Sequence, residues 1–196
     1  MPTINFVLSG LGGQGILFMT KIIAKTALRK GYNIMGAETH GMAQRGGSVI
    51  SHLRLGDVGS SLVKPGSAQF LLSLEENEAY RNLPFLAKHG HLYSDTVLDV
   101  FPRNSVKAYL DKMAIRYRAL PAGKIALDLG APVSSNLAMI GFFAAFQEGP
   151  FSADDFRETI VGISPEQFKD INLQVFEKGI SSGKVARHQV NNIAKR

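Results

Sequence analysis

The sequence predicts an α/β protein, and three features of its pattern lead to that prediction. An apolar run at residues 4–9 has the length of a buried strand and is stopped by glycines. A helical period of apolar residues begins directly after those glycines. Helical patterns later dominate the chain to its end. Together they indicate a Rossmann-like, mostly parallel sheet flanked by helices, with a helical C-terminal layer. The length of 196 residues fits a single domain over residues 1–196.

The first unit is expected to be a strand, a glycine turn, a helix and a second strand. Ile16, Met19 and Ile23 recur at spacings of three and four, which places them on one apolar helix face. Gly31 is a suitable C-cap for this helix, because glycine accepts the left-handed backbone found there. The second strand is predicted over residues 32–37. This order is the β-α-β unit of parallel sheets.

The middle of the chain is expected to add further strands. Residues 48–56 alternate apolar and polar side chains, as a half-buried strand does, and residues 57–63 are a candidate return strand beside them. The remaining predicted elements are, in order, a strand over 69–74, a helix over 75–88, and strands over 89–95 and 115–121.

The C-terminal layer has well-marked helix starts. Ser152 is the expected N-cap of a helix to residue 163, with acids in its first turn. Ser164, followed by a proline, opens a second helix that we expect to end at Gly179. Residues 134–149 are apolar nearly all round, so this helix should be buried on several sides or lie at a subunit contact. The tail over residues 183–196 is expected to fray.

Charge and composition limit the partners of the chain. Lys and Arg number 22 against 16 Asp and Glu, and the net charge of +6 favours anionic partners. No long basic run is present, so we expect no nucleic-acid partner. The chain has no cysteine and therefore ligates no iron–sulfur cluster by itself. The N-terminus does not resemble a signal peptide, and the most apolar segment, residues 137–146, is too short to span a bilayer. We therefore expect a cytoplasmic protein without a membrane partner.

The motif GLGGQG, residues 10–15, lies between the first strand and the first helix. Its glycines fit the pattern G-x-G-x-x-G, in which backbone N–H groups approach a phosphate at a helix N-terminus. Glu38 ends the second strand, near the position where a dinucleotide-binding fold keeps an acid for a ribose. These features support an NAD-binding protein. The alternative is a glycine turn that only lets the helix and strand pack closely.

The polar stretch AETHGMAQRGGSVISHLRLG, residues 37–56, does not fit an ordinary dehydrogenase. Arg45 has the geometry for a carboxylate or a phosphate, and Gly46 and Gly47 allow backbone conformations closed to other residues. His40 and His52 have no neighbouring acid pair, so we expect no metal site, and no catalytic residue is assigned.

With the turn GLGGQG, the run ETHGMAQRGGSVISHLRLG resembles the gamma subunit of the thiamine-diphosphate-dependent 2-oxoacid:ferredoxin oxidoreductases. This gamma domain also occurs as the beta subunit of indolepyruvate oxidoreductase. The resemblance covers most of the chain, because LPAGKIALDLG, SSNLAMIGFFAAF and INLQVFEKG follow in the order that the family shows.

The resemblance implies a set of cofactor-binding positions in two motifs. In the glycine turn they are Gly10, Gly12, Gly13, Gln14 and Gly15, and in the second motif Glu38, Thr39, His40, Gly41, Gln44, Arg45, Gly46 and Gly47. Gln44 and Arg45 could hold a substrate carboxylate or a cofactor phosphate, or the run could be a loop that locks a partner subunit. A role for Glu38 as a general base is less favoured.

The resemblance also implies a division of labour between subunits. Thiamine diphosphate, coenzyme A and iron–sulfur clusters belong to the assembled complex, and this chain alone is expected to hold none of them and to be inactive. The expected partner is the catalytic thiamine-diphosphate and iron–sulfur subunit, with ferredoxin as an indirect partner. Which 2-oxoacid is used, and whether the isolated chain forms a homodimer, stay open. The alternatives are an autonomous NAD-binding oxidoreductase and a nucleotide-sensing or scaffold protein of the same fold.

Overall fold

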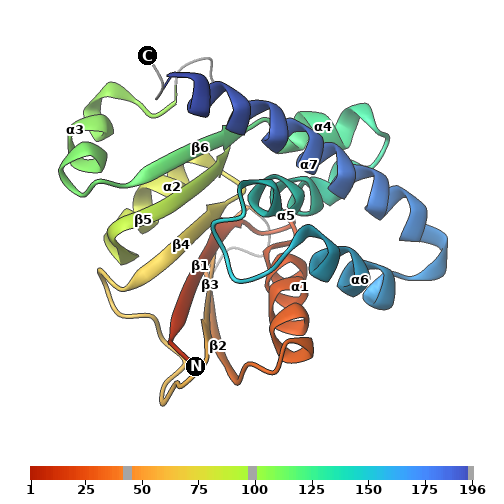
Figure 1. The fold of residues 1–196 in the computed structure, drawn as a ribbon, viewed down its shortest axis with the longest axis horizontal. Coiled ribbons are helices and arrows are strands. Elements are labelled where there is room, and N and C mark those ends of the chain that lie inside the picture. Colours follow the sequence, from red (N-terminus) through yellow and green to blue (C-terminus); the bar gives the residue numbers. More distant parts are fainter. Residues whose placement is uncertain (42–45, 97–100, 194–196) are drawn as a thin grey trace.

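The computed structural model describes residues 1–41, 46–96 and 101–193, and it shows one six-stranded sheet between two layers of helices (Figure 1). The spatial order of the strands is β2-β3-β1-β4-β5-β6. Their bounds are β1 (Ile4–Leu11), β2 (Ile34–His40), β3 (Ser48–Leu55), β4 (Ala68–Ser73), β5 (Leu86–Asp95) and β6 (Arg116–Leu120). The predicted α/β architecture is confirmed.

The helices divide between the two faces of the sheet. The described helices are α1 (Ile16–Arg29), α2 (Glu76–Asn82), α3 (Asn104–Lys112), α4 (Ala122–Asp128), α5 (Ser135–Phe146), α6 (Ala153–Ile163) and α7 (Glu166–Ile193). One core contains residues of α1, α4, α5, α6 and α7, and a second core contains residues of α2 and α3. The C-terminal helical layer therefore packs on the same side as α1 (Figure 1).

Strand β1 shows why the sheet is buried on both sides. Successive side chains of a strand point to opposite faces. Phe6 and Leu8 belong to the core under α1 and α5, while Val7 between them belongs to the core under α2. All three are fully buried. A continuous apolar run is typical of such a strand, which explains why this element could be predicted from the sequence.

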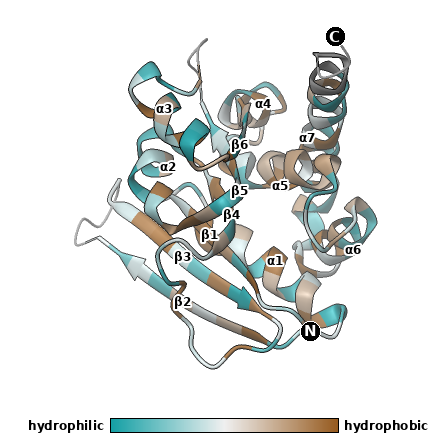
Figure 2. Cartoon of the chain, turned by 60° about the vertical axis from the view of Figure 1, so that its left-hand side comes forward, coloured by the Kyte–Doolittle hydropathy of each residue, from teal (hydrophilic) through white to brown (hydrophobic). Residues whose placement is uncertain are grey.

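The sheet is mostly parallel, but its first half contains one reversal. Strands β1, β4, β5 and β6 pair in parallel, and β3 pairs antiparallel with both β1 and β2. Strand β2 therefore runs parallel to β1 but lies at the sheet edge, separated from it by β3. Figure 2 shows β2 and β3 side by side at the outer part of the sheet.

Three predicted elements were wrong in extent or existence, and the second strand runs over Ile34–His40 instead of residues 32–37. Residues 57–63 form no strand, because side chains of β3 bond to their backbone. Arg54 donates to the carbonyl of Ser60 at 3.0 Å, and His52 accepts from the N–H of Val63 at 3.3 Å.

The helix predicted to residue 88 ends at Asn82, where a proline-containing 3-10 turn, Leu83–Phe85, leads directly into β5. Helices α3 and α4 were not predicted, since both are short and α3 buries a single residue.

The third wrong element is the last helix, which continues through Gly179 to Ile193 and includes most of the predicted tail. A Cβ atom at Gly179 would overlap the carbonyl oxygen of Ala138 on α5. Gly141 on α5 is equally close to the backbone of α7 at Phe176. These glycines therefore allow close contact between two helices, which the sequence pattern does not distinguish from a helix end.

Helix α5 is the centre of the C-terminal layer. Every residue from Ser135 to Phe146 is buried, as its apolar pattern predicts, and neighbouring helices and the sheet surround it. None of the described helices is both long enough and apolar enough to cross a membrane.

Candidate functional site at the carboxyl edge of the sheet

The candidate site lies at the carboxyl ends of the parallel strands β1, β4 and β5, which we call the carboxyl edge of the sheet. Strand β1 leads into α1 on one face, and its parallel neighbour β4 leads into α2 on the other face. In open α/β sheets, ligands bind outside the carboxyl ends of the strands where the connections change sides. The glycine turn, the second motif and two cavities all adjoin this edge.

The glycine turn has the backbone that its sequence predicts. Gly13 has a φ of 100°, and Gly15, the N-cap of α1, has a φ of 78°. Such angles are strained for other residues. At Gly10 the neighbours are close, because a Cβ atom there would lie 2.6 Å from the side-chain oxygen of Gln14, which would then have to shift. The positive φ angles of Gly13 and Gly15 are what favour glycine where β1 turns into α1.

Three N–H groups of the turn bond to the protein itself. The N–H of Gly12 donates to the carbonyl of Gly47 at 2.8 Å, and the N–H of Leu11 donates to Oε1 of Gln14 at 2.7 Å. The N–H of Gln14 donates to the carbonyl of Leu11 at 3.1 Å. A dinucleotide diphosphate would need free N–H groups in this loop. The turn is therefore partly closed on itself and on the second motif.

The second motif connects β2 to β3 beside the turn. Thr39 and His40 are exposed at the end of β2, and the N–H of Gly41 donates to the carbonyl of Ser48 at 2.8 Å. His40 lines a groove of about 420 Å³ together with Gly12 and other residues of the turn. The structure thus brings together the two motifs that the sequence singled out. Gln44 and Arg45 lie outside the described residues.

Glu38 and Thr39 do not lie beside the glycine turn. Glu38 is level with Ser51 of β3, which is level with Leu8 of β1, so a full strand separates Glu38 from β1. Two strand spacings correspond to about 10 Å. Glu38 is exposed and lines a separate cavity of about 340 Å³ over α1. Thr39 follows Glu38 in the strand and therefore points to the opposite face. The ribose-binding place of a dinucleotide fold, next to β1, is taken by β3.

The start of β3 is tied to the other face of the sheet through Ser48. Its hydroxyl donates to Oε2 of Glu78 at 2.6 Å, and Glu78 is 3% exposed on α2. Arg81 donates to the other oxygen of Glu78 at 2.7 Å. The second motif is therefore held from both sides, by the glycine turn and by a buried carboxylate.

A polar cavity of about 420 Å³ opens at the ends of β4 and β5. It is lined by Gln14, Leu74, Glu75, Glu76, Asp95, Thr96, Arg103, Gly123 and Lys124. Glu76 is buried and fully engaged, accepting from Tyr80 and Thr96 at 2.8 Å each and pairing with Arg103 at 3.0 Å. Apart from Gln14, sequence reasoning missed these residues. No binding motif marks them in the sequence, and the order of the strands brings them together.

Asp95 differs from the other residues of this cavity in the pKa of its carboxyl. Its Oδ2 accepts from the N–H of Gly123 at 2.9 Å, at the start of α4. Burial raises the pKa of this carboxyl to about 6, although the backbone bonds from Gly123 and Ala122 act in the opposite direction. Asp95 therefore exchanges a proton near neutral pH, which is typical of functional sites but also occurs in structural networks.

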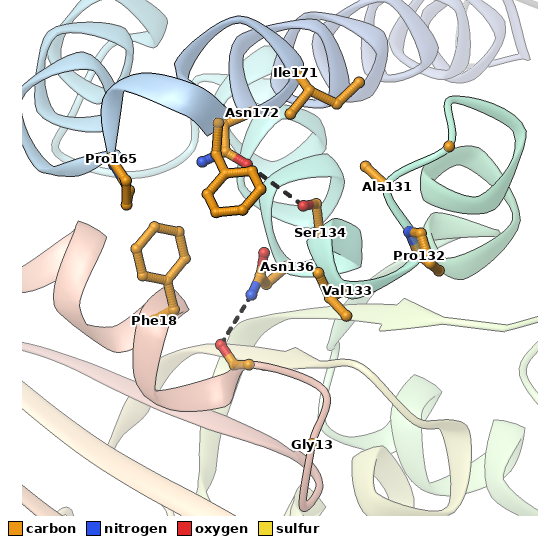
Figure 3. A pocket seen from close by; sticks show the side chains of 13 residues that line it. Gly13, Phe18, Ala131, Pro132, Val133, Ser134, Asn136, Pro165, Ile171 and Asn172 are labelled. Carbon is orange, nitrogen blue, oxygen red and sulfur yellow. Dashed lines mark hydrogen bonds between the residues drawn. The ribbon is translucent and has the colours of Figure 1, made fainter.

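An apolar cavity of about 500 Å³ lies on the α1 side of the turn (Figure 3). It is lined by Gly13, Gly15, Phe18, Gly130, Ala131, Pro132, Val133, Ser134, Asn136, Pro165, Phe168, Ile171 and Asn172. Asn136 comes from the start of α5 and donates to the carbonyl of Gly15 at 3.1 Å. The signal that could have found it is a lone amide at the head of an otherwise apolar helix.

No group of three or more His, Asp or Glu residues that could hold a metal ion occurs within residues 1–41, 46–96 and 101–193. His40 and His52 are in different environments. His40 is exposed, whereas His52 is buried, and burial lowers the pKa of its imidazole.

This arrangement defines a Rossmann-like α/β protein, and comparison with known proteins gives its family. Residues 5–182 match the model of the pyruvate ferredoxin/flavodoxin oxidoreductase family. The match covers most of the chain, so the chain belongs to this family.

The relatives agree with this assignment. The indolepyruvate oxidoreductase subunit IorB of Archaeoglobus fulgidus is 34% identical over 187 residues, covering 90% of this chain and 93% of the relative. Among solved structures, the keto/oxoacid ferredoxin oxidoreductase gamma subunit of Geobacter sulfurreducens aligns with a TM-score of 0.70 at 21% identity, over 92% of this chain and 98% of that one. The 2-oxoglutarate:ferredoxin oxidoreductase of Magnetococcus marinus, solved with 2-oxoglutarate, coenzyme A and succinyl-CoA bound, aligns with a TM-score of 0.74 at 18% identity. That match covers 94% of this chain and 32% of that chain.

Proposed function

We propose that residues 1–196 form the gamma-type subunit of a thiamine-diphosphate-dependent 2-oxoacid:ferredoxin oxidoreductase. The enzyme would decarboxylate a 2-oxoacid oxidatively to an acyl-CoA, with ferredoxin as electron acceptor. This chain would pack on the catalytic subunit and help to complete the active-site or coenzyme A region. The observation that carries the proposal is the match to a named indolepyruvate oxidoreductase subunit along nearly the whole length of both chains.

The residues of this chain fit a supporting role better than a cofactor-holding one. Without cysteine, the chain offers no thiolate for an iron–sulfur cluster. In the polar cavity, the cations Arg103 and Lys124 pair with Glu76 and Asp128, so a phosphate there would compete with these carboxylates. In the proposed complex, thiamine diphosphate supplies the electron sink for decarboxylation, held by the partner.

The second motif is the part of this chain that we propose to face the partner. Its exposed residues His40 and Gly41 rest on the rigid base formed by the Gly12–Gly47 and Ser48–Glu78 hydrogen bonds. Binding residues are often carried by loops that a scaffold of this kind positions. Gln44 and Arg45 are in this loop, and we propose that they contact either the substrate carboxylate or coenzyme A phosphate, or the partner subunit itself.

Reconstitution of the enzyme tests the proposal. The chain and its partner subunit are produced separately under anaerobic conditions, and 2-oxoacid-dependent reduction of a viologen dye is measured with coenzyme A. We expect no turnover with this chain alone, and full turnover only when both are combined. Full activity of the partner alone would refute the proposal, as would tight NAD binding by this chain with hydride transfer.

Replacement of Arg45 distinguishes the two proposed roles of the loop, ligand contact and subunit contact. In an Arg45→Ala complex, normal assembly with lost turnover would indicate a ligand contact, and lost assembly would indicate an interface contact. Lys25→Ala is the matched control, because it removes one positive charge from the exposed side of α1. We expect it to change neither assembly nor turnover.

A further inference from the structure

The apolar cavity beside the glycine turn has the features of a ligand site that the proposed function does not use. Its volume of about 500 Å³ is within the range of small-molecule pockets. It is lined by Phe18 of α1, by Val133 of the 3-10 turn Pro132–Ser134 that precedes α5, and by Phe168 of α7. Figure 3 shows Phe18 and Val133 on different sides of Asn136. Val133 is 74% exposed and Phe168 is 50% exposed, so the entrance is apolar as well.

The side chains that line the cavity are all uncharged. The polar ones belong to Ser134, Asn136 and Asn172. Two of these are engaged with each other, since the hydroxyl of Ser134 lies 3.4 Å from Oδ1 of Asn172. A carboxylate or phosphate would lose its hydration here without an ion pair in return. The lining therefore favours a neutral, largely apolar ligand.

Asn136 gives the cavity one specific polar feature. Its side-chain nitrogen donates to Gly15, but its Oδ1 is buried without a hydrogen-bond partner among the described residues. The residue is 3% exposed. Figure 3 shows Asn136 beside the cavity, with its side-chain nitrogen on the dashed bond and its oxygen on the other side of the amide. An unpaired buried acceptor is costly and rare in folded proteins. A ligand that donates a hydrogen bond at this point would satisfy it.

We propose that this cavity binds a neutral planar ring system that carries one N–H donor, with the rings against Phe18 and Phe168 and the N–H directed to Oδ1 of Asn136. Its position at the end of β1 is where open α/β sheets bind ligands. The inference rests on the cavity alone and stands or falls independently of the proposed enzyme complex.

Indole and indene are the probes, because they have nearly the same shape and only indole has an N–H. Each is titrated into the full chain, and the affinity is measured from chemical-shift changes in NMR spectra. We expect indole to bind about tenfold more tightly than indene, which corresponds to about 1.4 kcal/mol. Equal affinities, or no binding of either probe, would overturn the proposal.

Two variants locate the binding. Phe168→Ala should weaken the binding of both probes severalfold by removing one wall of the cavity. Val185→Ala is the control, because Val185 is also exposed on α7 but lies about 25 Å further along the helix. Asn136→Ala should abolish the preference for indole over indene. An unchanged preference in Asn136→Ala, or unchanged affinities in Phe168→Ala, would place the binding elsewhere and refute the assignment.

Discussion

Replacement of Asp95 by asparagine is expected to stabilise the chain above pH 6 and not below pH 4. Burial raises the pKa of this carboxyl to about 6 from an ordinary value of 3.8. The folded state therefore binds the proton more tightly than the unfolded state does. The contribution of Asp95 to stability is fully present below about pH 4 and is lost as the pH rises through about 6.

The magnitude follows from the size of the shift. About two pKa units correspond to about 3 kcal/mol, and screening of this partly exposed side chain reduces the expected effect to about 1–3 kcal/mol. Asparagine keeps an oxygen that can accept from the N–H of Gly123, so the variant avoids the cost of a buried charge without losing that bond.

Urea denaturation at about pH 4 and about pH 8 measures the effect as a free energy of unfolding. We expect equal stability of the wild type and Asp95→Asn at the lower pH and a more stable variant at the higher pH. Asp111→Asn is the control, since Asp111 is exposed on α3 and should change stability by less than about 0.5 kcal/mol. A variant that is no more stable than the wild type at about pH 8 would refute the reasoning.

Two further changes test the packing and the anchoring of the second motif. Gly179→Ala should destabilise the chain by about 2–4 kcal/mol in thermal unfolding, because its Cβ would overlap the backbone of α5. Gly162→Ala on α6 has no atom nearby and should be neutral or stabilise by up to about 1 kcal/mol; equal effects of the two would contradict the close contact. Ser48→Ala should cost about 1.5–3 kcal/mol and speed amide exchange at the start of β3, since Glu78 loses a buried donor. Unchanged exchange there would show that this bond does not anchor the motif.

The sequence predicts the elements whose signals are local. The run at residues 4–9 and the period starting at Ile16 predict β1 and α1, because burial on both faces and on one helix face leaves distinct patterns. The strand order is not local. Nothing in residues 48–56 indicates that β3 inserts between β1 and β2 in the reverse direction, which is the feature that separates Glu38 from the glycine turn.

The residues of the candidate site likewise divide into those that a local motif predicts and those that only the folded structure brings out. Gly13 and Gly15 have the positive φ angles that their motif predicts, and Gly12 contacts Gly47 of the second motif. Asp95 and Asn136 belong to the same edge, but the sequence assigned neither of them to the site. Asp95 becomes unusual only through burial, and Asn136 only through the lack of a partner for its Oδ1. Both properties depend on tertiary packing.

The most direct test of the proposed subunit role is anaerobic purification of the chain from its native host, with the mass and cofactor content of the species that contains it. The proposal predicts a stoichiometric complex with a larger subunit that carries thiamine diphosphate and iron–sulfur clusters, and 2-oxoacid-dependent dye reduction by that complex. Recovery of the chain alone, without such a subunit and with tightly bound NAD, would contradict it.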